Sequence, residues 1–221
     1  MRAALLLVLA MMAAPLPRPC DRQLAPLRTG TYSGNDHAGR WREDEAGSWA
    51  GDGWLGWNAD GGTLQPVRFI VRRRDEAGAP EIISVRSVPD VDFAVRCIPE
   101  VRPGRIRSIA IGGLAVDRPL RAVLGERRYE VRLETTRADF FDAKVILTDG
   151  RRTQVLYSAD GFADDPHFDI EWAGDLDRDG RLDLLVNLSR KYSVHPWRLL
   201  LSSRASATEL VGEAASFTTG D

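Results

Sequence analysis

Aspartates recur at alternate positions in the segment 175–183, which contains a single glycine. A hard divalent cation such as Ca2+ is held by about six to eight oxygen atoms, and carboxylates and main-chain carbonyls supply them in proteins. Carboxylates this close together would otherwise repel one another, and a bound cation removes that repulsion. The predicted Ca2+ ligands are the side chains of Asp175, Asp177, Asp179 and Asp183 and the main-chain carbonyl of Arg181. The alternative is an acidic, solvated turn that binds no metal.

The loop departs from an EF-hand in ways that predict its surroundings. Gly180 stands where the chain must reverse, a position that favours positive φ. Val186 occupies the twelfth position, where an EF-hand has a bidentate Glu, so we expect weak binding with a Kd of about 10⁻⁴–10⁻³ M. The flanking segments 168–172 and 182–188 are patterned like strands and not like amphipathic helices. The sequence therefore predicts a strand–loop–strand site whose ion pins one strand to the next.

The stretch from Trp172 to Val186, WAGDLDRDGRLDLLV, resembles the calcium loop of FG-GAP or VCBS repeats. Those repeats carry a Gly-Asp-x-(Asp/Asn)-x-Asp-Gly-x-x-Asp loop between strands. The resemblance, over residues 172–188, implies an EF-hand-like calcium loop held between two β-strands of an extracytoplasmic protein. The chain contains no second copy of the loop, so the several blades of a full propeller are not expected.

Residues 1–19 have the form of a secretory signal peptide followed by the start of an arm. Arg2 precedes the apolar run 5–9, and small residues follow at 13 and 14. The apolar run is too short to serve as a transmembrane anchor, and we expect cleavage near residues 13–19. The sequence Pro17-Arg18-Pro19 before Cys20 differs from the small apolar run that lipoprotein processing requires. The predicted location is therefore periplasmic or secreted.

Cys20 and Cys97 are the two cysteines of the chain. Disulfides persist outside the reducing cytosol, so we expect these two residues to pair. The alternatives are a free, buried Cys97 or a bridge to another chain. Millimolar calcium outside the cell also suits a loop of weak affinity, so the predicted location and the predicted site agree.

The elements that must position the loop are strands. Alternating apolar patterns predict an all-β protein, a β-sandwich or open barrel of antiparallel strands, with an N-terminal half at 20–115 and a C-terminal half at 116–221. Asp149-Gly150 is a hairpin signal. A net charge of −2 provides no basic field, and we expect no nucleic-acid binding. The candidate strands are 67–73, 82–88, 93–98, 106–111, 129–135, 144–148, 154–158, 168–172, 182–188, 197–201 and 209–217.

Trp54 and Trp57 belong to a segment rich in tryptophan and glycine. Flat aromatic faces on glycine-rich loops can stack on sugar rings, so one hypothesis is a carbohydrate-binding module that uses these two residues. The other is that both indoles pack in the core of a twisted hairpin. The expected partner is accordingly a polysaccharide or another extracytoplasmic protein.

Catalysis has little support in the sequence. The three histidines lack metal-ligand spacing, and no nucleophile motif is visible, so an enzyme would have to use carboxylates. Asp164, Asp165, Asp169 and Glu171 could complete the calcium shell, or form the acid/base pair of a hydrolase steadied by calcium. A solvated acidic loop explains Asp164 and Asp165 more simply. The sequence therefore favours an exported calcium-binding β-protein with a structural or binding role.

Overall fold

The computed structural model describes residues 20–27, 40–42, 46–74, 82–111 and 114–220. The predicted signal peptide lies outside these ranges. Within them the helical elements are two 3-10 turns, η2 (Gly47–Trp49) and η3 (Ser202–Arg204), and no helix is long and apolar enough to cross a membrane. The prediction of an all-β protein with antiparallel pairing is confirmed.

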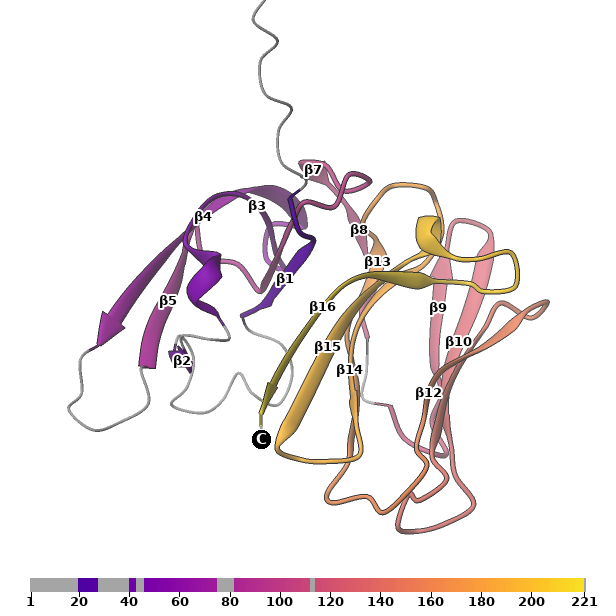
Figure 1. Cartoon of the computed structure of the whole chain (residues 1–221). Coiled ribbons are helices and arrows are strands. Elements are labelled where there is room, and N and C mark those ends of the chain that lie inside the picture. The colour runs from indigo at the N-terminus through magenta and orange to yellow at the C-terminus, as the bar shows by residue number, and fades with distance from the viewer. Residues whose placement is uncertain (1–19, 28–39, 43–45, 75–81, 112–113, 221) are drawn as a thin grey trace, which may run out of the picture.

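The N-terminal part of the chain forms a seven-stranded sheet in the order β1-β6-β3-β4-β5-β2, with β7 paired to β4. Its two end strands do not pair with each other, so the sheet is open and curls on one side of the molecule (Figure 1). The strands are β1 (Gln23–Pro26), β2 (Arg40–Arg42), β3 (Gly51–Asn58), β4 (Thr63–Arg74), β5 (Ile82–Val88), β6 (Phe93–Arg96) and β7 (Gly104–Arg105).

The C-terminal part forms a four-stranded sheet, β12-β11-β10-β9, and a five-stranded sheet, β16-β15-β14-β13-β8. β8 precedes the predicted division at residue 115, yet it pairs with β13, so the two parts are joined within one sheet. The strands are β8 (Arg107–Ser108), β9 (Leu120–Leu124), β10 (Arg127–Glu134), β11 (Lys144–Thr148), β12 (Thr153–Ser158), β13 (His167–Asp175), β14 (Asp183–Ser189), β15 (Val194–Leu201) and β16 (Gly212–Gly220).

The five-stranded sheet is covered on both faces. Leu184 and Val186 of β14 belong to the core shared with the four-stranded sheet, whereas Leu185 belongs to the core shared with the N-terminal sheet. Every residue of β14 is accordingly buried, as expected for a strand that lacks a solvated face. The aspartate-rich loop between β13 and β14 therefore connects two strands that are held firmly by packing.

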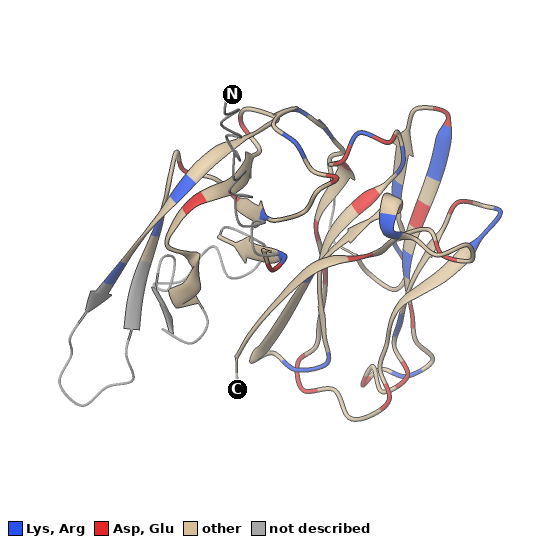
Figure 2. Ribbon diagram, turned by 45° about the horizontal axis from the view of Figure 1, so that its top comes forward, with Lys and Arg blue, Asp and Glu red and all other residues tan. Residues whose placement is uncertain are grey.

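The predicted hairpin at Asp149-Gly150 is confirmed, because β11 and β12 pair on either side of it and Gly150 has φ 82°. Basic and acidic residues both occur along the strands and loops of the four-stranded sheet (Figure 2). Ion pairs join Arg121 to Glu130 at 3.1 Å and Arg132 to Glu134 at 2.5 Å. These exposed pairs contribute little stability but keep a sheet face soluble.

Trp54 and Trp57 lie in the core and not on the surface, which corrects their assignment as ligand-binding residues. Trp54 is 1% exposed, donates its indole N–H to the carbonyl of Trp49 at 3.0 Å and packs edge-on against Phe69. Trp57 is 8% exposed and stacks on Phe93. The two side chains are three positions apart on β3 and enter different cores, so neither offers a face to a sugar.

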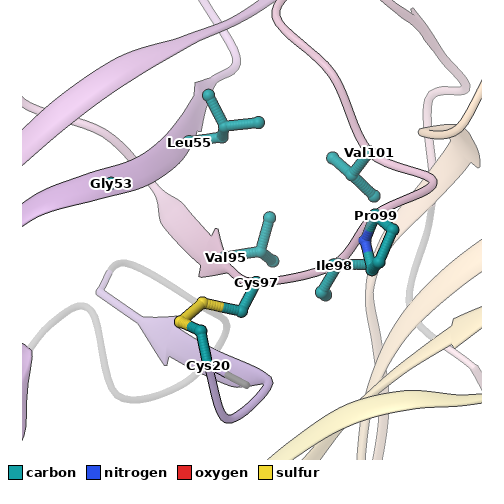
Figure 3. A pocket seen from close by; sticks show the side chains of 8 residues that line it. All are labelled: Cys20, Gly53, Leu55, Val95, Cys97, Ile98, Pro99 and Val101. Carbon is teal, nitrogen blue, oxygen red and sulfur yellow. A yellow bond between two sulfur atoms is a disulfide. The ribbon is translucent and has the colours of Figure 1, made fainter. Parts of the chain in front are cut away.

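Cys20 and Cys97 form the predicted intrachain disulfide, which excludes a free Cys97 and a bridge to another chain. It ties the chain just before β1 to the end of β6, beside the pairing of Gln23 with Arg96. Figure 3 shows the disulfide at the rim of an apolar pocket whose wall includes Ile98. The disulfide thus fixes β1 beside β6, the strand that leads into the wall of the pocket.

Gly174 allows β8 to approach β13, and its replacement tests this contact. A Cβ atom at Gly174 would lie 2.2 Å from the main-chain carbonyl of Arg107, which cannot rotate away. We expect Gly174→Ala to destabilise the fold by about 1–3 kcal/mol in urea unfolding. Gly61→Ala is the control, because a Cβ there has no atom within 4 Å. Equal midpoints for the two variants would contradict the close approach.

Candidate metal centre

The aspartate-rich loop connects β13 to β14 as the turn of an antiparallel hairpin. Gly180 has φ 78°, in agreement with the reversal predicted there, and Arg178 also has a positive φ, 65°. Two left-handed residues in a short loop bring the ends of the strands back toward each other. The strand–loop–strand arrangement predicted from the sequence is therefore present.

Asp175, Asp177 and Asp183 come together in this hairpin. Each offers a carboxylate oxygen, and these three oxygens lie within 4.8 Å of one another. Asp175 ends β13 and Asp183 begins β14, so the two strands fix two of the three residues, while Asp177 projects from the loop. Asp175 is 6% exposed and Asp183 is 0% exposed. This is an all-oxygen group that could hold a metal ion.

Main-chain N–H groups orient Asp183. One of its oxygens accepts from Leu176 at 2.7 Å and from Asp177 at 3.4 Å, and the other accepts from Ser202 at 2.8 Å. Ser202 belongs to η3, which follows β15, so a third part of the chain contributes to the site. The carboxylate that is most deeply buried is therefore also the one held most firmly.

The other two carboxylates receive fewer hydrogen bonds. The N–H of Gly180 donates to both oxygens of Asp175 at 3.2 Å, and the N–H of Asp179 donates to Asp177 at 3.2 Å. The Ser203 hydroxyl also donates to Asp177. Each carboxylate thus keeps acceptor capacity for an ion, because an ionised carboxyl group has about four lone-pair sites.

Asp179 is near the group but its side chain turns to other partners. Its carboxylate accepts from the guanidinium Nε of Arg181 at 2.8 Å and from the Ser202 hydroxyl at 2.7 Å. Asp179, which the sequence predicts as a calcium ligand, therefore already has a cationic partner in Arg181. The ligand roles predicted for Asp179 and for the Arg181 carbonyl stay predictions.

Burial and mutual repulsion disfavour ionisation in the three-carboxylate group. Burial, and then the charge of Asp177, raise the pKa of Asp183 to about 8. Burial raises the pKa of Asp175 as well, with contributions from Asp179 and Asp177. Burial would also raise the pKa of Asp179, but hydrogen bonds from Ser202 and Arg181 outweigh it and lower that pKa. A cation at the group would replace the protons that it otherwise holds.

The sequence did not indicate Ser202 and Ser203 as part of the site. They lie on η3, about twenty residues after the loop, and a pair of serines carries no metal-binding pattern of its own. Their approach follows from the pairing of β14 with β15, which sets the end of β15 beside the start of β14. Only the sheet register could have revealed them.

The other acidic residues considered in the sequence do not join the group. Asp169 pairs with Asn187 near the opposite end of β13, whereas Gly174 pairs with Asp183 at the loop. Asp164 lies in the loop before β13, where its N–H and carbonyl bond to Arg190 and Tyr192. Completion of the calcium shell by these residues is therefore wrong.

A second polar cluster lies across the five-stranded sheet, on its face toward the N-terminal sheet. Asn187 accepts from Nε2 of His167 at 3.2 Å and donates to Nδ1 of His195 at 3.1 Å, and the two imidazole rings stack 4.5 Å apart. Glu171 lies beside Asn187, and burial, followed by the charge of Asp169, raises its pKa to about 7. Burial lowers the pKa of His195 to about 4. Burial thus keeps His195 neutral and favours the protonated form of Glu171.

No family model matches this chain, and no curated protein or solved structure matches it either. The functional argument therefore depends on the geometry of the loop and on general chemistry.

Glu171→Gln tests the protonation of the second cluster. The pKa of this carboxyl is about 7 in the folded chain, above its ordinary value of 4.5, so folding favours its protonated form. Its contribution to stability is present at low pH and is lost as the pH rises through 7. We expect the Tm of the variant to fall less than that of the unmodified protein between about pH 4.5 and pH 7.5. The exposed Glu126→Gln should follow the unmodified protein, and parallel curves for all three would contradict the assignment.

Proposed function

We propose that this protein is an exported calcium-binding β-protein in which one Ca2+ ion at the β13–β14 loop has a structural or binding role. The observation that carries the proposal is the convergence of Asp175, Asp177 and Asp183 at a position where two of them are buried. Buried carboxylates that approach one another are costly unless a cation or a proton compensates them. Asp179, also expected as a ligand, instead accepts hydrogen bonds from Arg181 and Ser202 and so ties the loop to η3.

The donor set favours calcium over other metals. All three groups are carboxylates, and no histidine or cysteine is part of the cluster, which argues against zinc or copper. Magnesium demands near-ideal octahedral geometry, whereas calcium accepts an irregular shell from a flexible loop and completes it with carbonyls and waters. The FG-GAP or VCBS resemblance of residues 172–188 points to the same ion.

The ion would cross-link three parts of the chain. Asp175 ends β13, Asp183 begins β14, and both serines of η3 bond to carboxylates of the group. An ion that binds only the folded state stabilises it by mass action. This role needs no catalytic group, in keeping with a structural or binding protein.

Export is supported by the chain's chemistry. The disulfide is consistent with an extracytoplasmic location, and the signal-like residues 1–19 favour a periplasmic or secreted protein. Extracytoplasmic calcium is abundant enough to fill a site of weak affinity. The proposed partner is another extracytoplasmic protein, because the burial of Trp54 and Trp57 removes the residues expected to bind a polysaccharide.

Thermal unfolding of the protein from residue 20 onward tests the site directly. We expect Tm to rise across a calcium titration that starts from EDTA, because the ion binds the folded state. At a calcium concentration of about 100 times Kd the gain is about 2.7 kcal/mol. Magnesium at the same concentrations should give a smaller rise. A Tm that does not change with calcium would overturn the proposed function.

Asp177→Ala separates the metal role from a packing role. Removal of this carboxylate takes away one ligand, so the variant should bind calcium at least about tenfold more weakly in calorimetric titration. In EDTA its Tm should be equal to or above that of the unmodified protein, because Asp177 repels the buried Asp183. Asp60→Ala, in an exposed turn, is the control. Equal destabilisation with and without calcium would count against a metal ligand.

A further inference from the structure

Two residues of the calcium loop contact the N-terminal part of the chain instead of the carboxylate group. Leu176 is 0% exposed and packs in the core that contains Ile98, Val101 and Ile106. Arg178 donates one guanidinium nitrogen to the main-chain carbonyl of Arg102 at 2.8 Å and to that of Pro103 at 2.7 Å. Residues of the loop therefore alternate in role. Asp175 and Asp177 belong to the carboxylate group, whereas Leu176 and Arg178 contact the N-terminal part of the chain.

The contact of Arg178 is close and specific. A Cβ atom at Gly104 would lie 2.8 Å from its guanidinium nitrogen, and Gly104 has φ 127°, a conformation that other residues rarely adopt. Arg178 itself reaches these carbonyls from a left-handed conformation, φ 65°. The contact therefore depends on the conformation of the loop around Arg178, which the neighbouring carboxylates set.

The same segment, residues 98–108, is bound to the site at two further points. One guanidinium nitrogen of Arg204 of η3 contacts both carboxylate oxygens of Glu100, at 2.6 Å and 2.9 Å. The two preceding residues of η3 bond to carboxylates of the group. Asp175 pairs with Arg107 of β8 in the sheet. The site is thus joined to residues 98–108 by the hydrogen bonds of Arg178, the ion pair of Arg204 and the strand pairing of Asp175.

We propose that the calcium loop is a clasp, in which the bound ion couples the segment 98–108 to the five-stranded sheet. The inference rests on the proposed calcium site. In the ion-bound loop the carboxylates are drawn together, and Arg178 and Leu176 are fixed in their contacts. Without the ion, nothing links the three carboxylates, so the loop loosens and both contacts weaken. Calcium therefore controls the order of the segment that carries β7 and β8 and of Ile98 and Val101 in the pocket wall (Figure 3).

Hydrogen–deuterium exchange on the full chain from residue 20 tests the clasp, with calcium binding measured in parallel by calorimetry. At a calcium concentration of about 100 times Kd, exchange in peptides from 98–108 should slow by up to about 100-fold, because opening of the segment then requires release of the ion. Arg178→Ala should still bind calcium within about threefold but lose most of this slowing, since one good hydrogen-bond contact changes an equilibrium by about tenfold. Arg102→Ala is the matched control, because it removes an arginine side chain and keeps the acceptor carbonyl.

The outcomes separate the clasp from the site itself. If the unmodified protein binds no calcium, the proposed function fails and the clasp fails with it. If it binds calcium but exchange in 98–108 does not change, the site stands and the clasp is overturned. Equal slowing in Arg178→Ala and in the unmodified protein would also overturn it. Slowing that is lost in Arg178→Ala and kept in Arg102→Ala supports the clasp.

Discussion

The burial of the five-stranded sheet on both faces is the constraint on which the rest of the structure depends. β14 has no solvated side, so its apolar residues alternate between two different cores, with Leu184 and Val186 in one and Leu185 in the other. Polar groups that belong to this sheet have to find partners within the protein or bind a ligand. Asp183, at the first position of β14, is such a group, and three main-chain N–H groups hold its carboxylate.

The candidate metal centre and the second polar cluster are two solutions to this constraint at opposite ends of the same strands. At the loop, carboxylates gather where a cation would compensate them. At the other end, Asn187 bridges two histidines, and burial keeps His195 neutral and favours the protonated form of Glu171. The second cluster extends from His167, at the start of β13, to Glu171 in the middle of that strand, and Asn187 pairs with Trp197 of the apolar core. Polar groups therefore enter the sheet between its ends as well as at the loop.

The sequence predicted the part of the site that depends on local spacing. The alternate aspartates and Gly180 were sufficient to place a tight loop between two strands and to bring Asp175, Asp177 and Asp183 together. The turning of Asp179 toward Ser202 could not be predicted, because it depends on a residue 23 positions away. The burial of Trp54 was equally open, since a glycine-rich strand and an exposed loop have similar compositions. The glycines of β3 argue against a strand in the sequence, but the packing of Trp54 and Trp57 stabilises one.

The short strand β1 indicates the order in which the chain can assemble. It pairs with β6, through Gln23 and Arg96, and it lies beside β16 at the other end of the sequence (Figure 1). Leu24 and Ala25 enter two different cores. β1 can pair with β6 once residue 96 has been synthesised, but its contacts with β16 can form only after the C-terminal strand exists. The disulfide between Cys20 and Cys97 closes on the first of these two contacts, and so holds β1 in place for the second.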